Sequence, residues 1–194
     1  IWTEFDNVEV SLARGNGINI VSNATTNQLT MRNVRSAYSG GYGIYVNNTQ
    51  TDLANGLLFD KLNVEYNGRN HSTPNCAGVY LTGISQANIT NSYFEGNCAY
   101  NTADNTGAEI RLSGTYNQSV NIQDNVFNLQ YTENGIYNDT LQTTGRYDGN
   151  KFTGSGVNGL TIYIATGHTT SNVIVGANFS SSPTIVPDVN GNTH

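Results

Sequence analysis

The chain has 194 residues and a formal net charge of −6; Asn, Thr, Ser and Gly account for 88 residues, and Lys and Arg for only 8. Because the four abundant residue types are weak helix formers, the composition excludes a helical bundle, and an acidic chain without a basic cluster is not expected to bind nucleic acid. No apolar run reaches the roughly 18 residues of a membrane-spanning helix, so no membrane insertion is expected.

Two short patterns alternate along the chain, with a repeat of about 28 residues. In the first pattern, two apolar residues enclose four others; its copies are Phe5–Val10, Leu29–Val34, Phe59–Val64, Ile89–Phe94, Ile122–Phe127, Tyr147–Phe152 and Ile174–Phe179. In the second pattern, apolar residues alternate after a glycine; its copies are Gly17–Ile20, Gly43–Val46, Gly78–Leu81 and Gly159–Ile162, with weaker ones at Gly107–Ile110 and Gly135–Asn138. A fixed order with variable spacing is typical of a solenoid whose surface loops differ in length.

Each repeat is predicted to form a coil of short strands. Alternation in the glycine-led pattern indicates strand, and the residues Asn91, Asn125, Gly149 and Asn150 suit a sharp bend within the other pattern. We therefore expect an all-β protein, a right-handed single-stranded parallel β-helix of about seven coils. Its inner stack should contain Ile18, Ile44, Val79, Ile110, Ile136 and Leu160.

The sequence is expected to form one β-helix domain over residues 1–194. It begins directly in strand-like sequence without an initiator Met, so we interpret it as a piece of a longer chain. Residues 180–194, which hold two of the three prolines, are expected to form a partial last coil or a tail. Open coils at both ends would expose unpaired strand edges, so a monomer is not expected to be self-sufficient.

The alternation of Gly-Ile-Tyr-Val at 43–46 with Ile-Thr-Asn-Ser-Tyr-Phe at 89–94 resembles the pectate-lyase-like β-helix superfamily. The richness in Asn, Thr and Gly is similar to that of bacteriophage tailspikes. This resemblance covers nearly the whole chain and implies a homotrimer in the virion tail that binds, and often cleaves, bacterial surface polysaccharide such as O-antigen or capsule. The repeats are specific for the fold and weak for the function.

Stacking of the glycine-led strands is expected to gather aromatic and charged side chains on one outer face. That face would carry Tyr45, Tyr80, Tyr137 and Tyr163 around Glu109, Arg111 and Asp139. Aromatic rings stack on sugar rings, and carboxylates and arginine bind hydroxyls, so the pattern predicts a glycan platform between the long loops 65–77 and 95–106. The alternative is structural, because tyrosine suits any exposed strand and stacks on itself.

Hydrolysis of a glycosidic bond needs one carboxyl as acid and a second as base or nucleophile. We expect Glu109 to be the acid and Asp139 to activate water, with Tyr80 and Tyr137 stacked on sugar rings and Arg111 on a hydroxyl or an acidic substituent. Glu65 and Glu95 form a second candidate pair, one coil apart, whose repulsion Arg35 could offset. The open alternatives are a glycan-binding segment without catalysis, a structural stalk, and a secreted polysaccharide lyase.

Other chemistry has weak signals. The three histidines are scattered without ligand spacing, so no metal and no cofactor are expected. Cys76 and Cys98 fall in the two long loops; the sequence leaves their disulfide open, and free thiols are expected if the protein is made in bacterial cytoplasm.

Overall fold

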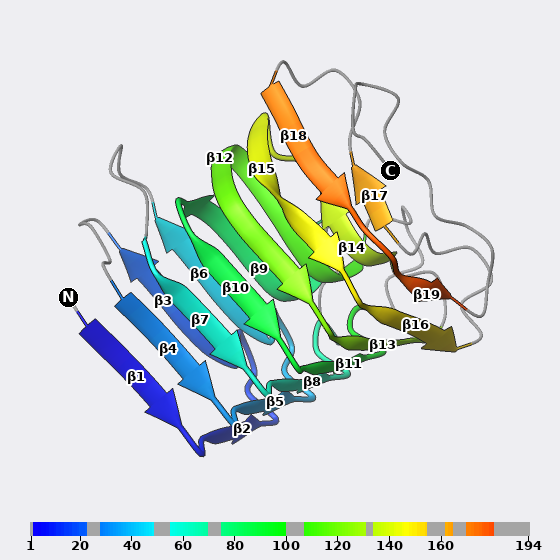
Figure 1. The fold of residues 1–194 in the computed structure, drawn as a ribbon. Coiled ribbons are helices and arrows are strands. Elements are labelled where there is room, and N and C mark those ends of the chain that lie inside the picture. Colours follow the sequence, from blue (N-terminus) through cyan, green and yellow to red (C-terminus); the bar gives the residue numbers. More distant parts are fainter. Residues whose placement is uncertain are drawn as a thin grey trace.

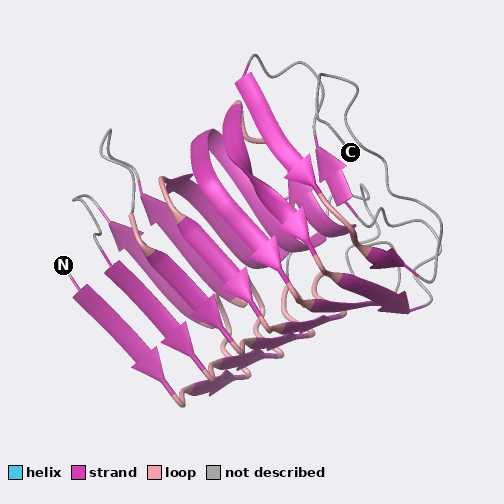
Figure 2. Ribbon diagram, viewed as in Figure 1, coloured by secondary structure: helices cyan, strands magenta, loops and turns pink. Residues whose placement is uncertain are grey.

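A computed structural model of the chain contains strands and loops, with no helix in the part that it describes (Figure 2). It describes residues 2–22, 28–48, 55–69, 75–99, 107–130, 134–154, 162–164 and 170–180. Each strand pairs in parallel with the equivalent strand one turn away, so the strands stack in order along one axis (Figure 1). The chain is therefore a parallel β-solenoid, as predicted.

The solenoid has three faces, which we name by their most distinctive residues. The tyrosine face consists of β3 (Ile18–Ser22), β6 (Ile44–Asn48), β9 (Ala77–Ile84), the first part of β12 (Ala108–Gln123), β14 (Asn134–Asn138) and β17 (Ile162–Ile164). The glutamate face consists of β2 (Glu9–Ser11), β5 (Arg35–Ala37), β8 (Asn63–Glu65), β11 (Tyr93–Glu95), β13 (Val126–Leu129), β16 (Lys151–Gly154) and β19 (Phe179–Ser180). The third face consists of β1 (Trp2–Asp6), β4 (Gln28–Arg32), β7 (Leu57–Asp60), β10 (Ala87–Thr90), the last part of β12, β15 (Gln142–Asp148) and β18 (Thr170–Val175).

The number of turns is slightly smaller than predicted. Seven strands stack on the glutamate face, but the first and the last have only one neighbour each. The solenoid thus has about five fully stacked turns instead of about seven. The end turns carry exposed apolar side chains, among them Trp2 and Leu12 at one end and Phe179 at the other.

The inner stack of the tyrosine face follows the predicted register. Ile18 pairs with Ile44, Ile44 with Val79, Val79 with Ile110, and Ile110 with Ile136, and all five are buried. Each fully buried aliphatic side chain contributes about 1.5–3 kcal/mol to folding. Leu160 lies outside the described residues; Ile162 is the residue that pairs with Ile136.

Two copies of the first pattern are out of register. In the last turn, Val175 pairs with Tyr147 and Phe179 pairs with Lys151, so the copy is shifted by one residue and both Ile174 and Phe179 are exposed.

The copy in the second turn is shifted by two residues. The second turn was expected to place Leu29 and Val34 in line with Phe59 and Val64, but Met31 pairs with Phe59 and Ser36 with Val64. Both Leu29 and Val34 are nonetheless buried. Several positions in this turn are apolar, so the apolar pattern alone allowed two registers that differ by two residues.

Stacked polar residues form the bends. A column of residues with positive φ follows the third face and includes Asn7, Asn33, Lys61, Asn91, Asp124 and Gly149, which confirms the predicted role of Asn91 and Gly149. Asn125 and Asn150 instead lie inside, where the Asn125 side-chain amide donates to Oδ1 of Asn150 at 3.0 Å. This asparagine ladder satisfies buried backbone groups at the bend: the Asn125 backbone N–H donates to the same oxygen at 3.1 Å.

Candidate functional site

A column of tyrosines crosses the tyrosine face from one turn to the next. Tyr45 pairs with Tyr80, Tyr80 with Arg111, Arg111 with Tyr137, and Tyr137 with Tyr163. The four tyrosines face outward and are half-buried. The expected gathering of Tyr45, Tyr80, Arg111, Tyr137 and Tyr163 on one face is therefore present in the structure, with Arg111 at its centre.

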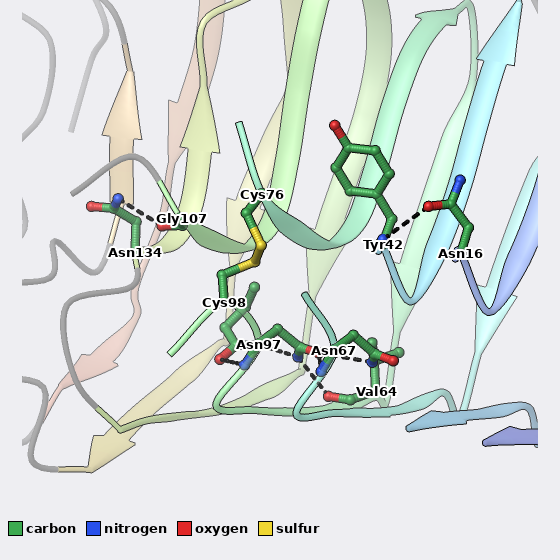
Figure 3. The surroundings of a disulfide bond; sticks show 10 residues. Asn16, Tyr42, Val64, Asn67, Cys76, Asn97, Cys98, Gly107 and Asn134 are labelled. Atoms are coloured by element: carbon green, nitrogen blue, oxygen red, sulfur yellow. Dashed lines mark hydrogen bonds between the residues drawn. A yellow bond between two sulfur atoms is a disulfide. The ribbon is translucent and has the colours of Figure 1, made fainter. Parts of the chain in front are cut away.

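Tyr42, just before β6, belongs to the same column although the sequence patterns did not select it. Its ring lies 5.0 Å from that of Tyr45 and 4.9 Å from that of Tyr80, measured between centroids. Burial, and then the neighbouring phenols Tyr80 and Tyr45, raise the pKa of Tyr42 to about 12. The signal that the patterns missed was an aromatic residue directly before the glycine that begins the second pattern. The Tyr42 backbone N–H donates to Oδ1 of Asn16 at 3.0 Å (Figure 3).

The rings of this column stack mainly on one another. The Tyr137 and Tyr163 centroids are 4.5 Å apart at an interplanar angle of 22°, and the Arg111 guanidinium carbon lies 4.4 Å from the Tyr137 centroid. Since Arg111 and Tyr163 belong to the two turns on either side of Tyr137, both of its ring faces are covered. Tyr137 is thus not placed to stack on a sugar ring as expected.

Arg111 is buried with its charge neutralised. Its Nη2 lies 2.5 Å from Oδ2 of Asp139, and the two side chains are 3% and 26% exposed, respectively. A buried guanidinium needs such a partner because removing an unpaired charge from water is costly. Asp139, directly after β14, therefore holds Arg111 in place and is not presented to solvent as an isolated carboxylate.

Glu109 does not lie on the tyrosine face, which corrects the prediction that it faces outward between two aromatic residues. It lies opposite Gly78, since Ala108 pairs with Ala77 and Ile110 with Val79, at the corner where other turns have glycine, and it is fully buried. Its Oε1 accepts the Asn97 backbone N–H at 3.2 Å, and its Oε2 accepts the Asn97 side-chain amide. Asn67 and Asn97 form a second asparagine ladder, in which the Asn67 backbone N–H and side-chain amide both donate to Oδ1 of Asn97. Glu109 is the acceptor at the end of this ladder.

The error has an identifiable cause. Aligning Gly107 with Gly78 put Glu109 in the tyrosine column, whereas the structure aligns Ile110 with Val79 and Arg111 with Tyr80. At the corner, an added Cβ on Gly78 would lie 2.7 Å from Cγ of Asn97, so a side chain at this position points toward the asparagine ladder. A charged residue in place of a corner glycine was the available signal.

Glu65 and Glu95 pair directly on neighbouring strands, as predicted for the second carboxylate pair. Arg35 binds Glu65, with Nη2 at 3.1 Å from Oε2, and Glu9, with Nη1 at 2.5 Å from Oε1. The predicted compensation by Arg35 is thus present, although Arg35 pairs in register with Asn63 and not with Glu65. Neighbouring strands lie about 4.8 Å apart, close to the separation of the two carboxyls in a retaining glycosidase.

Both oxygens of Glu95 act as acceptors. Its Oε1 accepts the Tyr66 hydroxyl at 2.8 Å and the side-chain amides of Asn128 and Gln130, while its Oε2 accepts the Tyr93 hydroxyl at 2.8 Å. The hydrogen bond to Glu95 raises the pKa of Tyr66 well above its usual range. Four hydrogen bonds therefore hold the Glu95 side chain in place.

A disulfide between Cys76 and Cys98 joins the two loops that were expected to border the site. The two residues are 22 apart in sequence and belong to neighbouring turns. Figure 3 shows the disulfide beside the Asn67–Asn97 ladder. The expectation of free thiols is corrected; residues 70–74 and 100–106 of the loops lie outside the described part of the chain.

Within the described ranges, no group of three His, Cys, Asp or Glu side chains is arranged to hold a metal ion. The same ranges contain no helix long and apolar enough to cross a membrane. Comparisons of the chain with protein-family models, with curated proteins and with solved structures gave no match. The assignment of function consequently depends on the geometry of the faces and on the resemblance of the repeats.

Proposed function

We propose that the chain is a glycan-binding β-helix of the tailspike type, which holds bacterial surface polysaccharide on its tyrosine face without cleaving it. The observation that carries this proposal is the outward column of Tyr42, Tyr45, Tyr80, Tyr137 and Tyr163, braced by the Arg111–Asp139 pair. By the resemblance, such a protein acts as a homotrimer in the virion tail.

The column offers a hydroxyl-rich ligand a fixed row of polar groups. A phenol both donates and accepts hydrogen bonds, and ring stacking between turns limits the motion of each tyrosine. Amide side chains extend the row: Asn47 lies beside the column and its amide donates to the Tyr45 hydroxyl at 2.9 Å. A rigid surface loses little conformational entropy when it binds an extended glycan.

Binding without cleavage is favoured because the first carboxylate pair is not available for acid–base chemistry. Glu109 is fully buried and hydrogen-bonded to Asn97, and Asp139 is tied to Arg111. A general acid must reach the glycosidic oxygen to within hydrogen-bond distance, which a buried carboxyl below the surface cannot do.

The test removes hydroxyls while keeping the rings. The triple variant Tyr80→Phe, Tyr137→Phe, Tyr163→Phe should weaken binding to purified host polysaccharide by about tenfold or more, because three hydrogen-bonding groups are lost. The matched control is Tyr116→Phe, which removes an exposed phenol from the corner after the first part of β12. Isothermal titration calorimetry gives the affinities, and unchanged thermal unfolding shows that the fold is intact.

Equal affinity of the triple variant and the parent protein would contradict a binding role for the column. If the triple variant instead lost trimer assembly in light scattering, the column would be a contact between chains, as in a structural stalk.

A hydrolase is the second candidate, because Glu65 and Glu95 pair on neighbouring strands. In that case the full chain should release reducing ends from host polysaccharide, and Glu65→Gln and Glu95→Gln should each abolish the release. If the parent protein releases no reducing ends from a polysaccharide that it binds, the hydrolase candidate fails and the binding function stands.

A further inference from the structure

The charges of the solenoid are distributed unevenly among its faces. The glutamate face carries Glu9, Arg35, Glu65, Glu95 and Lys151 on its outer side, and the third face carries Glu4, Asp6, Arg32, Asp60, Arg146 and Asp148. The described strands of the tyrosine face contain just two charged residues, Glu109 and Arg111, and Glu109 points inward. Among the described strands, those of the tyrosine face thus hold the fewest charged residues, although the chain as a whole has a net charge of −6.

The cation on this face is not placed to receive an acidic ligand. The side chain of Arg111 is 3% exposed, it is bound to Asp139 at 2.5 Å, and it covers the ring of Tyr137 at 4.4 Å. A sugar carboxylate could reach the guanidinium only by displacing Asp139. Asp139 is the more exposed member of the pair, so the neutralised pair offers an approaching anion no accessible positive charge.

Apart from the exposed Val21 of β3, the outward strand side chains beside the tyrosine column are uncharged amides and hydroxyls. Asn19, Asn47, Thr82 and Ser113 occupy outward positions of β3, β6, β9 and β12, and Asn47 pairs in register with Thr82. Amides and hydroxyls bind neutral sugar hydroxyls without any charge to neutralise. The ligand that matches the face has many hydroxyls and no ionised group.

We propose that the tyrosine face selects uncharged polysaccharide and rejects polysaccharides that contain uronic acids or other ionised sugars. This inference rests on the proposed function and narrows it to a class of ligand. Discrimination here comes from the absence, among the described strand residues of the face, of an accessible cation, because Asp139 already occupies Arg111.

The test uses matched pairs of ligands. Each acidic capsule or O-chain preparation is used in its native form and after chemical reduction of its carboxyl groups, alongside naturally neutral preparations. The full chain should bind neutral and carboxyl-reduced polysaccharides at least about tenfold more tightly than the native acidic forms. Affinity for the neutral ligands should change by less than about twofold when sodium chloride rises from about 0.05 to about 0.5 M.

A variant with an added cation tests the reason for this selectivity. Thr82→Lys places an ammonium group beside Tyr80 on β9 and should raise affinity for native acidic polysaccharide at low salt by about threefold or more. The matched control Thr30→Lys makes the same change on β4 of the third face and should leave the selectivity unchanged.

Tighter binding of the native acidic forms by the parent protein would overturn the inference and leave the glycan-binding function intact. Absence of binding to every preparation, neutral or acidic, would overturn both.

Discussion

Tyrosines stack on both the tyrosine face and the glutamate face, but the two faces differ in how their charges are paired. On the glutamate face, the Tyr38 and Tyr66 ring centroids lie 5.5 Å apart. On the tyrosine face, a single ion pair between Arg111 and Asp139 is buried within the aromatic column. On the glutamate face, Arg35 binds two glutamates at the surface, and Glu95 accepts hydrogen bonds from two tyrosines. The comparison indicates that stacked tyrosines can lie beside either a nearly uncharged surface or a network of exposed charges. The neighbouring side chains decide which of the two forms.

The largest effect is expected for the ion pair of the tyrosine face, measured against a surface ion pair of the third face. Asp139→Ala leaves the buried guanidinium of Arg111 without its carboxylate and should lower the free energy of unfolding by about 3 kcal/mol. Glu4→Ala removes an exposed partner of Arg32, at 3.4 Å, and should cost about 0.5 kcal/mol or less. Urea unfolding followed by circular dichroism measures both, and equal losses would show that the Arg111 pair is no more important than a surface pair.

The disulfide lies at the corner between the two faces and ties the third and fourth turns together. Replacing Cys76 and Cys98 by Ser should lower the free energy of unfolding by about 3 kcal/mol, because the unfolded chain regains the freedom of a closed loop of this length. Dithiothreitol should produce the same loss in the parent protein and none in the double-serine variant. A parent protein whose stability does not respond to the reductant would contradict a stabilising disulfide.

Alkaline pH should destabilise the tyrosine column. Tyrosines in the unfolded chain ionise near pH 10, whereas Tyr42 in the folded protein keeps its proton up to a pKa of about 12. The contribution of Tyr42 is therefore complete below pH 10 and is lost as the pH rises through 12; for this half-exposed group we expect about 1 kcal/mol. Between pH 9 and pH 11.5, the free energy of unfolding should fall less in Tyr42→Phe than in Tyr116→Phe. Equal falls in the two variants would exclude Tyr42 as a cause of alkaline destabilisation.

The smallest effect is expected on the glutamate face. Glu65→Gln removes one of the two carboxylates bound to Arg35 and leaves the Glu9 pair, so the loss should be about 0.5 kcal/mol. The shared arginine and the solvent around it compensate for the missing charge. A loss as large as that of Asp139→Ala would show that the glutamate face is as tightly organised as the tyrosine face.

Much of the fold could be predicted from the sequence, and the candidate site only in part. The alternation of Ile44 and Val46, or of Val79 and Leu81, specifies which side of a strand is buried, because side chains of a strand alternate between its two faces. That rule also put Tyr45, Tyr80 and Tyr137 on a common outer face, and alignment of the copies of the first pattern predicted that Glu65 and Glu95 would pair.

The orientation of side chains at the corners and the contacts between neighbouring turns could not be predicted from the sequence. At a corner, alternation no longer tells inside from outside, so Glu109 entered the interior where the asparagine ladder needed an acceptor. Tyr42 joined the column from a loop, and the disulfide formed because two loops distant in sequence meet on adjacent turns.

Local periodicity in the sequence specifies the repeat, the side of each strand to which its side chains point, and the inner stack. Contacts between turns, which exist only once the chain is coiled, decide the rest. They select between strand registers that differ by one or two residues, bury Arg111 and Glu109, and orient the tyrosine rings.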